Sequence, residues 1–135
     1  MKLFVGAKAV IQRSDGKVLI VREGSAYEEG TNIGKWDVPG GRIEADEALL
    51  AGLAREVKEE AGLEVEVGEV LYAADNFPEI KGEKAHVVRI YFACTTTKQE
   101  IVLSKDHDEH AWVDQTDIEK YAVMEDAAIA IRNLQ

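Results

Sequence analysis

The stretch GGRIEADEALLAGLAREVKEEAGL (Gly40–Leu63) contains a glycine-rich turn followed by a long helical pattern. Its apolar residues recur with the three- and four-residue spacing of an amphipathic helix (Leu50, Leu53, Ala54, Val57 and Ala61). We predict a helix from Glu47 to Ala61, with Asp46 as N-cap and Gly62 at the C-terminal capping position. The apolar stripe can pack on a sheet and thereby fix the helix.

Three acidic residues of this helix, Glu56, Glu59 and Glu60, share one face. At about 100° per residue they fall within a sector of roughly 100°, beside the apolar stripe. A cluster of this kind is either a solvated surface or a site for a cation. The like charges of Glu56 and Glu60 destabilise a helix by only a few tenths of a kcal/mol. The helix alone therefore leaves both interpretations open.

The remaining chain alternates extended and helical patterns. Expected strands cover residues 3–12, 18–23, a short segment before Pro39, 64–77, 84–97 and 110–114. A turn is expected at 14–17, a polar loop at 24–34, and a second helix over Glu125–Asn133 within a helical region from 117 to 134. This order predicts an α/β fold with a mixed β-sheet between helices, in one domain over residues 1–135.

Composition restricts the class of function. The 135 residues are 46% hydrophobic and carry a formal charge of −10, which argues against binding a nucleic-acid polymer. No apolar run suggests a membrane span or a signal peptide, so we expect a cytoplasmic protein that does not bind membranes. The single cysteine, Cys94, lies on the inward face of a strand pattern. A small phosphorylated substrate is compatible with this charge if divalent cations neutralise it.

The spacing of residues in the opening stretch resembles the Nudix box, GX5EX7REUXEEXGU, in which U is a bulky aliphatic residue. Every specified position matches between Gly41 and Leu63, with Glu47 and Arg55 at the required places. A chance match in a chain of this length is on the order of 10⁻⁷ or less at average amino-acid usage. The KWDVPGG entry, Glu44 and a late AWVD strand extend the resemblance.

This resemblance implies a MutT-like Nudix hydrolase with an α/β/α sandwich fold. The implied activity is Mg²⁺-dependent hydrolysis of a nucleoside diphosphate linked to another moiety, with Mn²⁺ as a substitute ion. A nucleoside triphosphate, cleaved to a monophosphate and pyrophosphate, is the leading substrate. ADP-ribose or another nucleotide sugar is the alternative, and a non-catalytic nucleotide-binding regulatory module is an alternative of another class. Because relatives often dimerise, a homodimer also stays open.

The resemblance also implies roles for residues of the box. By position, Glu59 and Glu60 resemble the principal metal ligands, and Glu56 resembles a ligand or the general base. Glu47 resembles the structural acid of the box, which orients Arg55, and Gly62 resembles its structural glycine. The backbone at Gly40 and Gly41, with the Gly41 carbonyl as a metal ligand, would approach metal and phosphates.

Outside the box, the candidates are less specific. In MutT-like enzymes a loop before the late tryptophan strand often supplies another metal carboxylate, for which Asp106 and Glu109 are the candidates here. Arg22 and Arg42 are candidate phosphate contacts, because guanidinium groups match phosphate oxygens. Trp36 can stack on a base or cover the core, and the core interpretation is favoured. His107 and His110 are expected to be solvated loop residues, and His86 to be structural.

Overall fold

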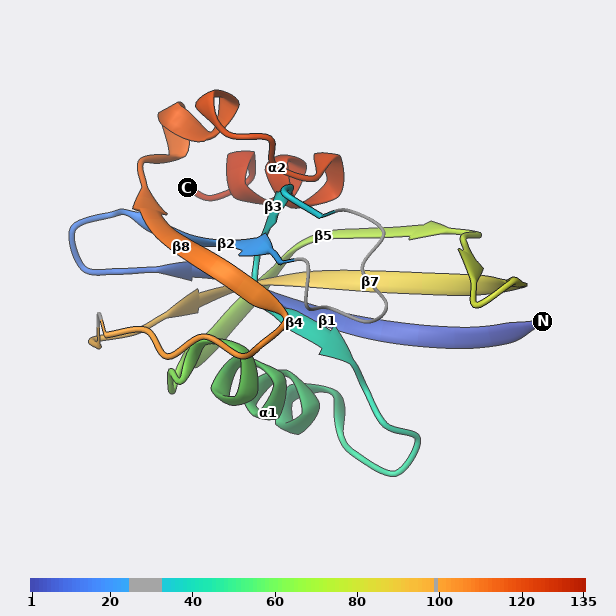
Figure 1. Ribbon diagram of the computed structural model, residues 1–135. Coiled ribbons are helices and arrows are strands. Elements are labelled where there is room, and N and C mark those ends of the chain that lie inside the picture. The colour runs from blue at the N-terminus through green and yellow to red at the C-terminus, as the bar shows by residue number, and fades with distance from the viewer. Residues whose placement is uncertain (25–32, 99) are drawn as a thin grey trace.

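A mixed β-sheet lies between two helical layers in the computed structural model, which describes residues 1–24, 33–98 and 100–135 (Figure 1). The strands are β1 (Lys2–Gln12), β2 (Val18–Glu23), β3 (Trp36–Asp37), β4 (Gly40–Arg42), β5 (Glu66–Asn76), β6 (Glu79–Ile80), β7 (Glu83–Thr95) and β8 (His107–Val113). The helices are α1 (Leu49–Ala61), a 3₁₀ helix (Gln115–Lys120) and α2 (Glu125–Arg132). The predicted α/β fold with helices on both sides of a mixed sheet is confirmed.

The strand β1 is the centre of the sheet. The main strand order is β3-β2-β1-β7-β5, while β4 pairs with β1, β8 with β2 and β6 with β7. The β1–β7 pairing is parallel, and the other pairings are antiparallel. Consecutive residues Ala9, Val10 and Ile11 of β1 are all fully buried, because helices cover both faces of the sheet at this point.

Two hydrophobic clusters fill the two sides of the sheet. On the α1 side, Leu53 and Val57 pack with β-strand residues that include Leu19 and Phe92. On the α2 side, Ile131 packs with residues of the same strands that have the opposite parity. Cys94 is buried in the α1-side cluster, as predicted, and burial raises the pKa of its thiol to about 12.

The start of α1 differs from the prediction. The helix begins at Leu49, Ala48 occupies the N-cap position without a side-chain cap, and residues 45–47 form a turn. The proposed cap at Asp46 is therefore wrong. The reason is a tertiary contact, because the side chain of Glu47 is turned toward Arg55 of the helix. The predicted end is confirmed, since Gly62 has φ of 71° and its N–H donates to Lys58.

The other elements follow the predicted order with changes in length. The late strand begins at His107 rather than His110, since it stays paired with β2 as far as Glu23 through a β-bulge. The predicted connection over 78–84 contains the short strand β6. Most of the polar loop expected at 24–34 lies outside the described residues. Across the described ranges, no helix combines the length and apolar character that crossing a bilayer requires.

Candidate active site

Gly40 and Gly41, expected to form a turn, lie instead in strand β4 and bring its backbone against two acidic residues of α1. The N–H of Gly40 donates to Glu60 Oε2 at 3.0 Å. The carboxylate of Glu56 lies so near Gly41 that an added Cβ would be 2.5 Å from Oε2. Gly40 has φ of 141°, and a Cβ there would overlap the carbonyl oxygen of Ala7. Backbone packing thus requires glycine at Gly40, whereas a Cβ at Gly41 would displace the Glu56 carboxylate.

Arg55 connects four residues around the start of the site. Its Nε and Nη2 donate to the two oxygens of Glu47 at 3.0 and 2.6 Å, which is a bidentate pair. Its Nη1 lies 3.2 Å from Glu56 and 3.3 Å from Glu59, and Nη2 also donates to the carbonyl of Arg42 at 3.3 Å. The contact expected between Glu47 and Arg55 is present, and it fixes Arg55 between two of the three acids.

The electrostatics differ sharply among the acids. The hydrogen bonds from Arg55 lower the pKa of Glu47 to about 2. Burial, opposed by the charge of Lys8 and by the Gly40 N–H, raises the pKa of Glu60 to about 7. Burial also raises the pKa of Glu56, whose side chain is 14% exposed, whereas that of Glu59 is 58% exposed. Glu56 and Glu60 are therefore crowded and poorly hydrated, whereas Glu59 faces water.

Lys8 is a site residue that the sequence reasoning missed. It lies opposite Gly40 in the β1–β4 ladder, and its Nζ is 3.1 Å from Asp37 Oδ2. Burial has the largest effect on the pKa of Glu60 and raises it. The charge of Lys8 has the second-largest effect and lowers it. A signal was present, because GAKAVIQ places one lysine inside an otherwise small and apolar strand. A cation therefore already lies beside the carboxylates.

Of the two carboxylate candidates near the start of the late strand, Glu109 is already paired with an arginine. Glu109 is opposite Arg22 in the β2–β8 ladder and forms an ion pair with it at 3.1 Å, while Asp108 accepts from Arg22 Nε at 2.8 Å. The carbonyl of Asp106 accepts from Gly24 N–H at 2.9 Å. Considering only the described ranges, no three acidic, histidine or cysteine side chains converge closely enough to hold a metal ion as they stand.

The histidines are partly as expected. The prediction that His107 is a solvated loop residue is wrong. His107 begins β8, and its buried Nδ1 has no hydrogen-bond partner among the described residues. His110 also lies in β8 rather than in a loop, but it is exposed. His86 stacks on Phe77 with ring centroids 4.3 Å apart and bonds to Asp75 at 2.7 Å, which fits a structural role.

Two substrate-contact candidates lie apart from the box acids. Trp36 is 8% exposed and packs edge-to-face on Tyr121, with ring centroids 5.4 Å apart, as the favoured core interpretation predicts. The guanidinium of Arg42 lies 4.0 Å from the centroid of the Phe4 ring. Because residues alternate along β4, Arg42 points to the opposite face of the strand from Gly41 and Glu56.

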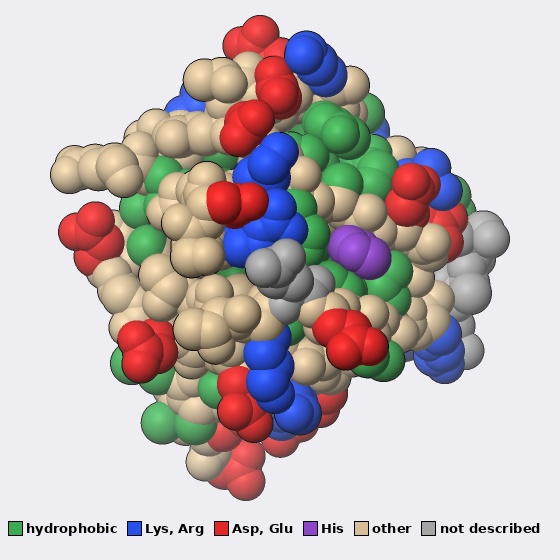
Figure 2. All heavy atoms as spheres, turned by 90° about the vertical axis from the view of Figure 1, so that its left-hand side faces the viewer, with side chains coloured by type: hydrophobic (Ala, Val, Ile, Leu, Met, Phe, Trp, Pro, Cys, Tyr) green, Lys and Arg blue, Asp and Glu red, His purple; other side chains and the backbone are tan. Residues whose placement is uncertain are grey.

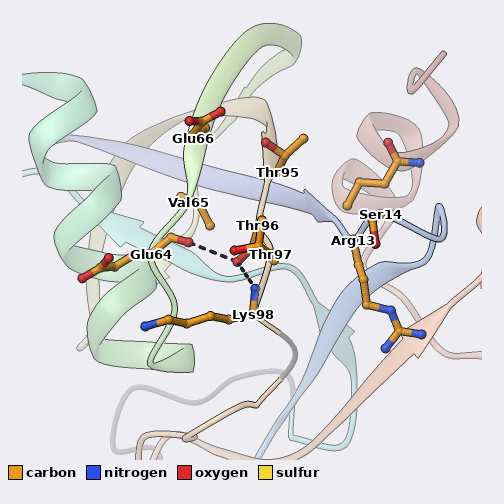
Figure 3. Close-up of a pocket in the computed structure, with 10 residues that line it drawn as sticks. Arg13, Ser14, Glu64, Val65, Glu66, Thr95, Thr96, Thr97 and Lys98 are labelled. Atoms are coloured by element: carbon orange, nitrogen blue, oxygen red, sulfur yellow. Dashed lines mark hydrogen bonds between the residues drawn. The ribbon is translucent and has the colours of Figure 1, made fainter.

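A cavity of about 520 Å³ lies elsewhere, between the ends of β1 and β7 and the start of β5 (Figure 3). Thr96 closes one side, since its Oγ1 donates to the carbonyl of Glu64 at 3.1 Å and accepts from Lys98 N–H at 3.3 Å. None of the predicted site residues lines this cavity. Glu56, Glu59 and Glu60 therefore lie outside this cavity.

Comparison with known proteins agrees with this arrangement. A family model described as NUDIX domain matches residues 2–134, and the chain therefore belongs to the Nudix family. The CTP pyrophosphohydrolase of Escherichia coli K12 is 36% identical over 87 residues, which cover 64% of this chain and 60% of that protein. Nudix hydrolase 5 of Arabidopsis thaliana is 31% identical over 105 residues, covering 78% of this chain and 33% of that protein.

A solved structure extends the similarity to the fold. The crystal structure of the MutT protein from Methanosarcina mazei Go1 superposes with a TM-score of 0.81 at 28% identity, covering 97% of this chain and 91% of that one. By contrast, the chain spans only 60% and 33% of the lengths of the E. coli and Arabidopsis relatives. The likeness to the archaeal structure thus covers nearly the whole of both chains.

The Glu47–Arg55 pair offers a first test of the site. We expect Glu47→Gln to lower kcat about 10- to 100-fold, the usual range for residues that orient a metal ligand. The physical reason is that Arg55 loses the bidentate partner that holds it against Glu56 and Glu59. Steady-state kinetics with saturating Mg²⁺ would measure the effect. An unchanged kcat would show that the pair only stabilises the loop.

Proposed function

We propose that this chain is a Mg²⁺-dependent pyrophosphohydrolase that cleaves a nucleoside triphosphate to a nucleoside monophosphate and pyrophosphate. The observation that carries the proposal is the meeting of Glu56 and Glu60 with the bare backbone of Gly40 and Gly41. That geometry places two acids, which can bind cations, against backbone that carries no side chain. The name of the E. coli relative, a CTP pyrophosphohydrolase, supports a triphosphate as substrate.

The donor set fits magnesium. Glu56, Glu59 and Glu60 would hold the ion with the carbonyl of Gly41, and all of these donors are oxygen, which Mg²⁺ prefers. The absent side chain at Gly41 lets the Glu56 carboxylate lie against the backbone, because a Cβ there would be only 2.5 Å from Oε2. Asp106 is our candidate for a further carboxylate. Glu109 is the weaker candidate, because Arg22 already binds its carboxylate.

The residues of the chain have separable tasks in this proposal. Arg55, held by Glu47, positions Glu56 and Glu59 by donating from Nη1 to both carboxylates. Gly40 N–H fixes the carboxylate of Glu60, and Glu56 or Glu60 accepts the proton of the attacking water. When bound, Mg²⁺ supplies charge neutralisation for the diphosphate and a lower pKa for a bound water. Phosphate contacts come from Arg22 and Arg42 in this scheme.

A substrate panel tests the activity. Purified protein with Mg²⁺ would be incubated with nucleoside triphosphates, oxidised deoxynucleotides, ADP-ribose, NADH and dinucleoside polyphosphates, and products resolved by anion exchange. We expect monophosphate and pyrophosphate from a triphosphate, loss of the activity in EDTA, and recovery with Mg²⁺ or Mn²⁺. AMP and ribose phosphate from ADP-ribose would replace the substrate assignment. No turnover of any compound would favour a non-catalytic nucleotide-binding module.

A further inference from the structure

Lys8 is a buried lysine without a role in the reaction described above. Its side chain is only 13% exposed, although lysine is almost never buried unless it is paired. Figure 2 shows the usual situation, in which basic side chains lie at the surface beside acidic ones on the face that carries the β1–β2 turn. Burying an ammonium group removes its hydration, so neighbouring groups must compensate for the loss. The neighbours of Lys8 therefore indicate what it does.

The chain brings Lys8 to the box acids where it crosses from β2 to β1. β3 pairs with β2, and β4 then pairs with β1, where Gly40 is opposite Lys8. The crossing places Asp37 beside the lysine, with Nζ 3.1 Å from Oδ2. It also places Gly40 beside α1, where its N–H donates to Glu60. One short segment, residues 37–40, thus contacts both Lys8 and an acid of the box.

The ammonium group of Lys8 is charged and has few hydrogen bonds. Burial lowers the pKa of Lys8, but Asp37 and the charge of Glu60 together outweigh burial, and the pKa is raised. An ammonium group has three N–H donors. Among the described residues, Nζ donates to Asp37 alone, and no ion pair joins it to Glu60. Its other donors are therefore left for a group outside the protein chain.

A second polar group at the same place also lacks a protein partner. Burial and the charge of Lys8 lower the pKa of His107, while the charge of Asp37 raises it, so the imidazole lies close to this pair. The buried Nδ1 of His107 has no hydrogen-bond partner within the described part of the chain. Buried polar atoms in native proteins are nearly always hydrogen-bonded. Unsatisfied groups on two strands, near one carboxylate, indicate a place where a polar ligand binds.

The charges of the place select an anionic ligand. The proposed Mg²⁺ site lies at Glu56 and Glu60, and an ammonium group close to a divalent cation is destabilised by the repulsion of like charges. A phosphate group offsets this repulsion, because its oxygens can bind the metal and accept from the ammonium group at the same time. Lysine commonly binds phosphate as a point charge. The ligand class that fits Lys8 is therefore a phosphate group bound at the box acids.

We propose that Lys8 binds the substrate, with its ammonium group donating to an oxygen of the diphosphate that lies at the box acids. The proposal rests on the proposed function and adds to it a residue from a strand outside the Nudix box. Asp37 is then a positioning residue, which holds the ammonium group without contacting the substrate. Because Lys8 recognises phosphate oxygens and not a base, its loss affects all nucleotide substrates alike.

The test uses Lys8→Met, which keeps a long side chain without the charge, and Lys2→Met as a matched control at the exposed start of the same strand. Methylenediphosphonate, a diphosphate analogue that resists hydrolysis, is titrated into each protein with Mg²⁺ and followed by calorimetry. We expect Lys8→Met to raise the Kd about tenfold, the effect of one charge-assisted hydrogen bond. The kcat/KM of every hydrolysed panel compound should fall by a similar factor. The control should match the wild type.

Asp37→Asn separates substrate binding from a structural role. The substitution removes the carboxylate charge but leaves the ammonium group and an oxygen that accepts from it. If Lys8 binds phosphate, the loss of a nearby negative charge should not raise the Kd of methylenediphosphonate. If the pair only holds β3 against β1, both variants should weaken binding equally. Circular dichroism verifies each fold, and should Lys8→Met not fold, the double variant Lys8→Met/Asp37→Asn carries the same expectation because it leaves neither charge of the pair unpaired.

Three outcomes would overturn the role of Lys8. These are a wild-type Kd in Lys8→Met, equal weakening in Lys8→Met and Asp37→Asn, and a wild type that does not bind methylenediphosphonate. A wild type that hydrolyses no panel compound, but binds methylenediphosphonate about tenfold more tightly than Lys8→Met does, contradicts the proposed function and leaves the phosphate contact of Lys8 in place.

Discussion

Glu60→Gln is expected to lower kcat/KM by about a thousandfold, the upper range for removing one electrostatic group from an active site. The substitution removes one negative charge from the proposed cation site and one of the two candidate bases. The fold should persist, because the glutamine oxygen can still accept the Gly40 N–H. A neutral amide also avoids the crowding of two carboxylates in this half-buried position. Hydrolysis of the best panel substrate, together with thermal unfolding, measures both effects.

A matched control separates site chemistry from the loss of negative charge in general. Glu64→Gln changes the same chemical group four residues later, at a side chain that is 77% exposed and pairs with Lys58 at 3.7 Å. We expect its activity to be within twofold of the wild type. Near-normal activity in Glu60→Gln would contradict the metal-site assignment. Equal losses in both variants would indicate that the overall charge of the protein causes the loss of activity.

Gly40→Ala is expected to destabilise the fold by about 3 kcal/mol or more, the range for severe backbone strain combined with steric overlap. A Cβ would overlap the Ala7 carbonyl and lie 2.7 Å from the Cα of Lys8. These are backbone atoms of the central strand, so neither can move without disturbing the β1–β4 and β1–β7 ladders. Urea unfolding followed by circular dichroism measures the change.

Gly82→Ala is the control for backbone strain alone. Gly82 also has positive φ, at 80°, but a Cβ there would meet nothing within 4 Å. We expect a loss of only about 1 kcal/mol, the cost of a left-handed conformation for alanine. If Gly40→Ala costs no more than Gly82→Ala, the close approach of β4 to β1 does not determine stability.

The sequence predicted the elements whose signals are local or periodic. The stripe that includes Leu53 and Val57 indicated the buried face of α1, and Gly62 indicated its end. The start of α1 was predicted wrongly because Asp46 looks like a cap locally. The turn is instead fixed by Glu47, whose partner Arg55 is eight residues away. Local propensity does not contain such a contact.

The site was predictable where a motif fixes its spacing and not where strands bring residues together. The shared face of Glu56 and Glu60 followed from helical geometry, and the pairing of Glu47 with Arg55 was expected from the resemblance to the Nudix box. Lys8 comes from a strand whose neighbours are set by sheet order, which periodicity does not reveal. The engagement of Glu109 by Arg22 depends in the same way on the β2–β8 register.

The parallel pairing of β1 with β7 has a consequence for how the chain folds. Each residue of β1 pairs with the residue 83 positions later, from Lys2 with Ala85 (85 − 2 = 83) to Gln12 with Thr95 (95 − 12 = 83). Chain entropy must be lost over this long separation before the central strand gains its parallel partner, so this pairing raises the contact order and slows folding. During synthesis, the edge of β1 that pairs with β7 stays open until β7 has left the ribosome, and aggregation competes with folding in that interval.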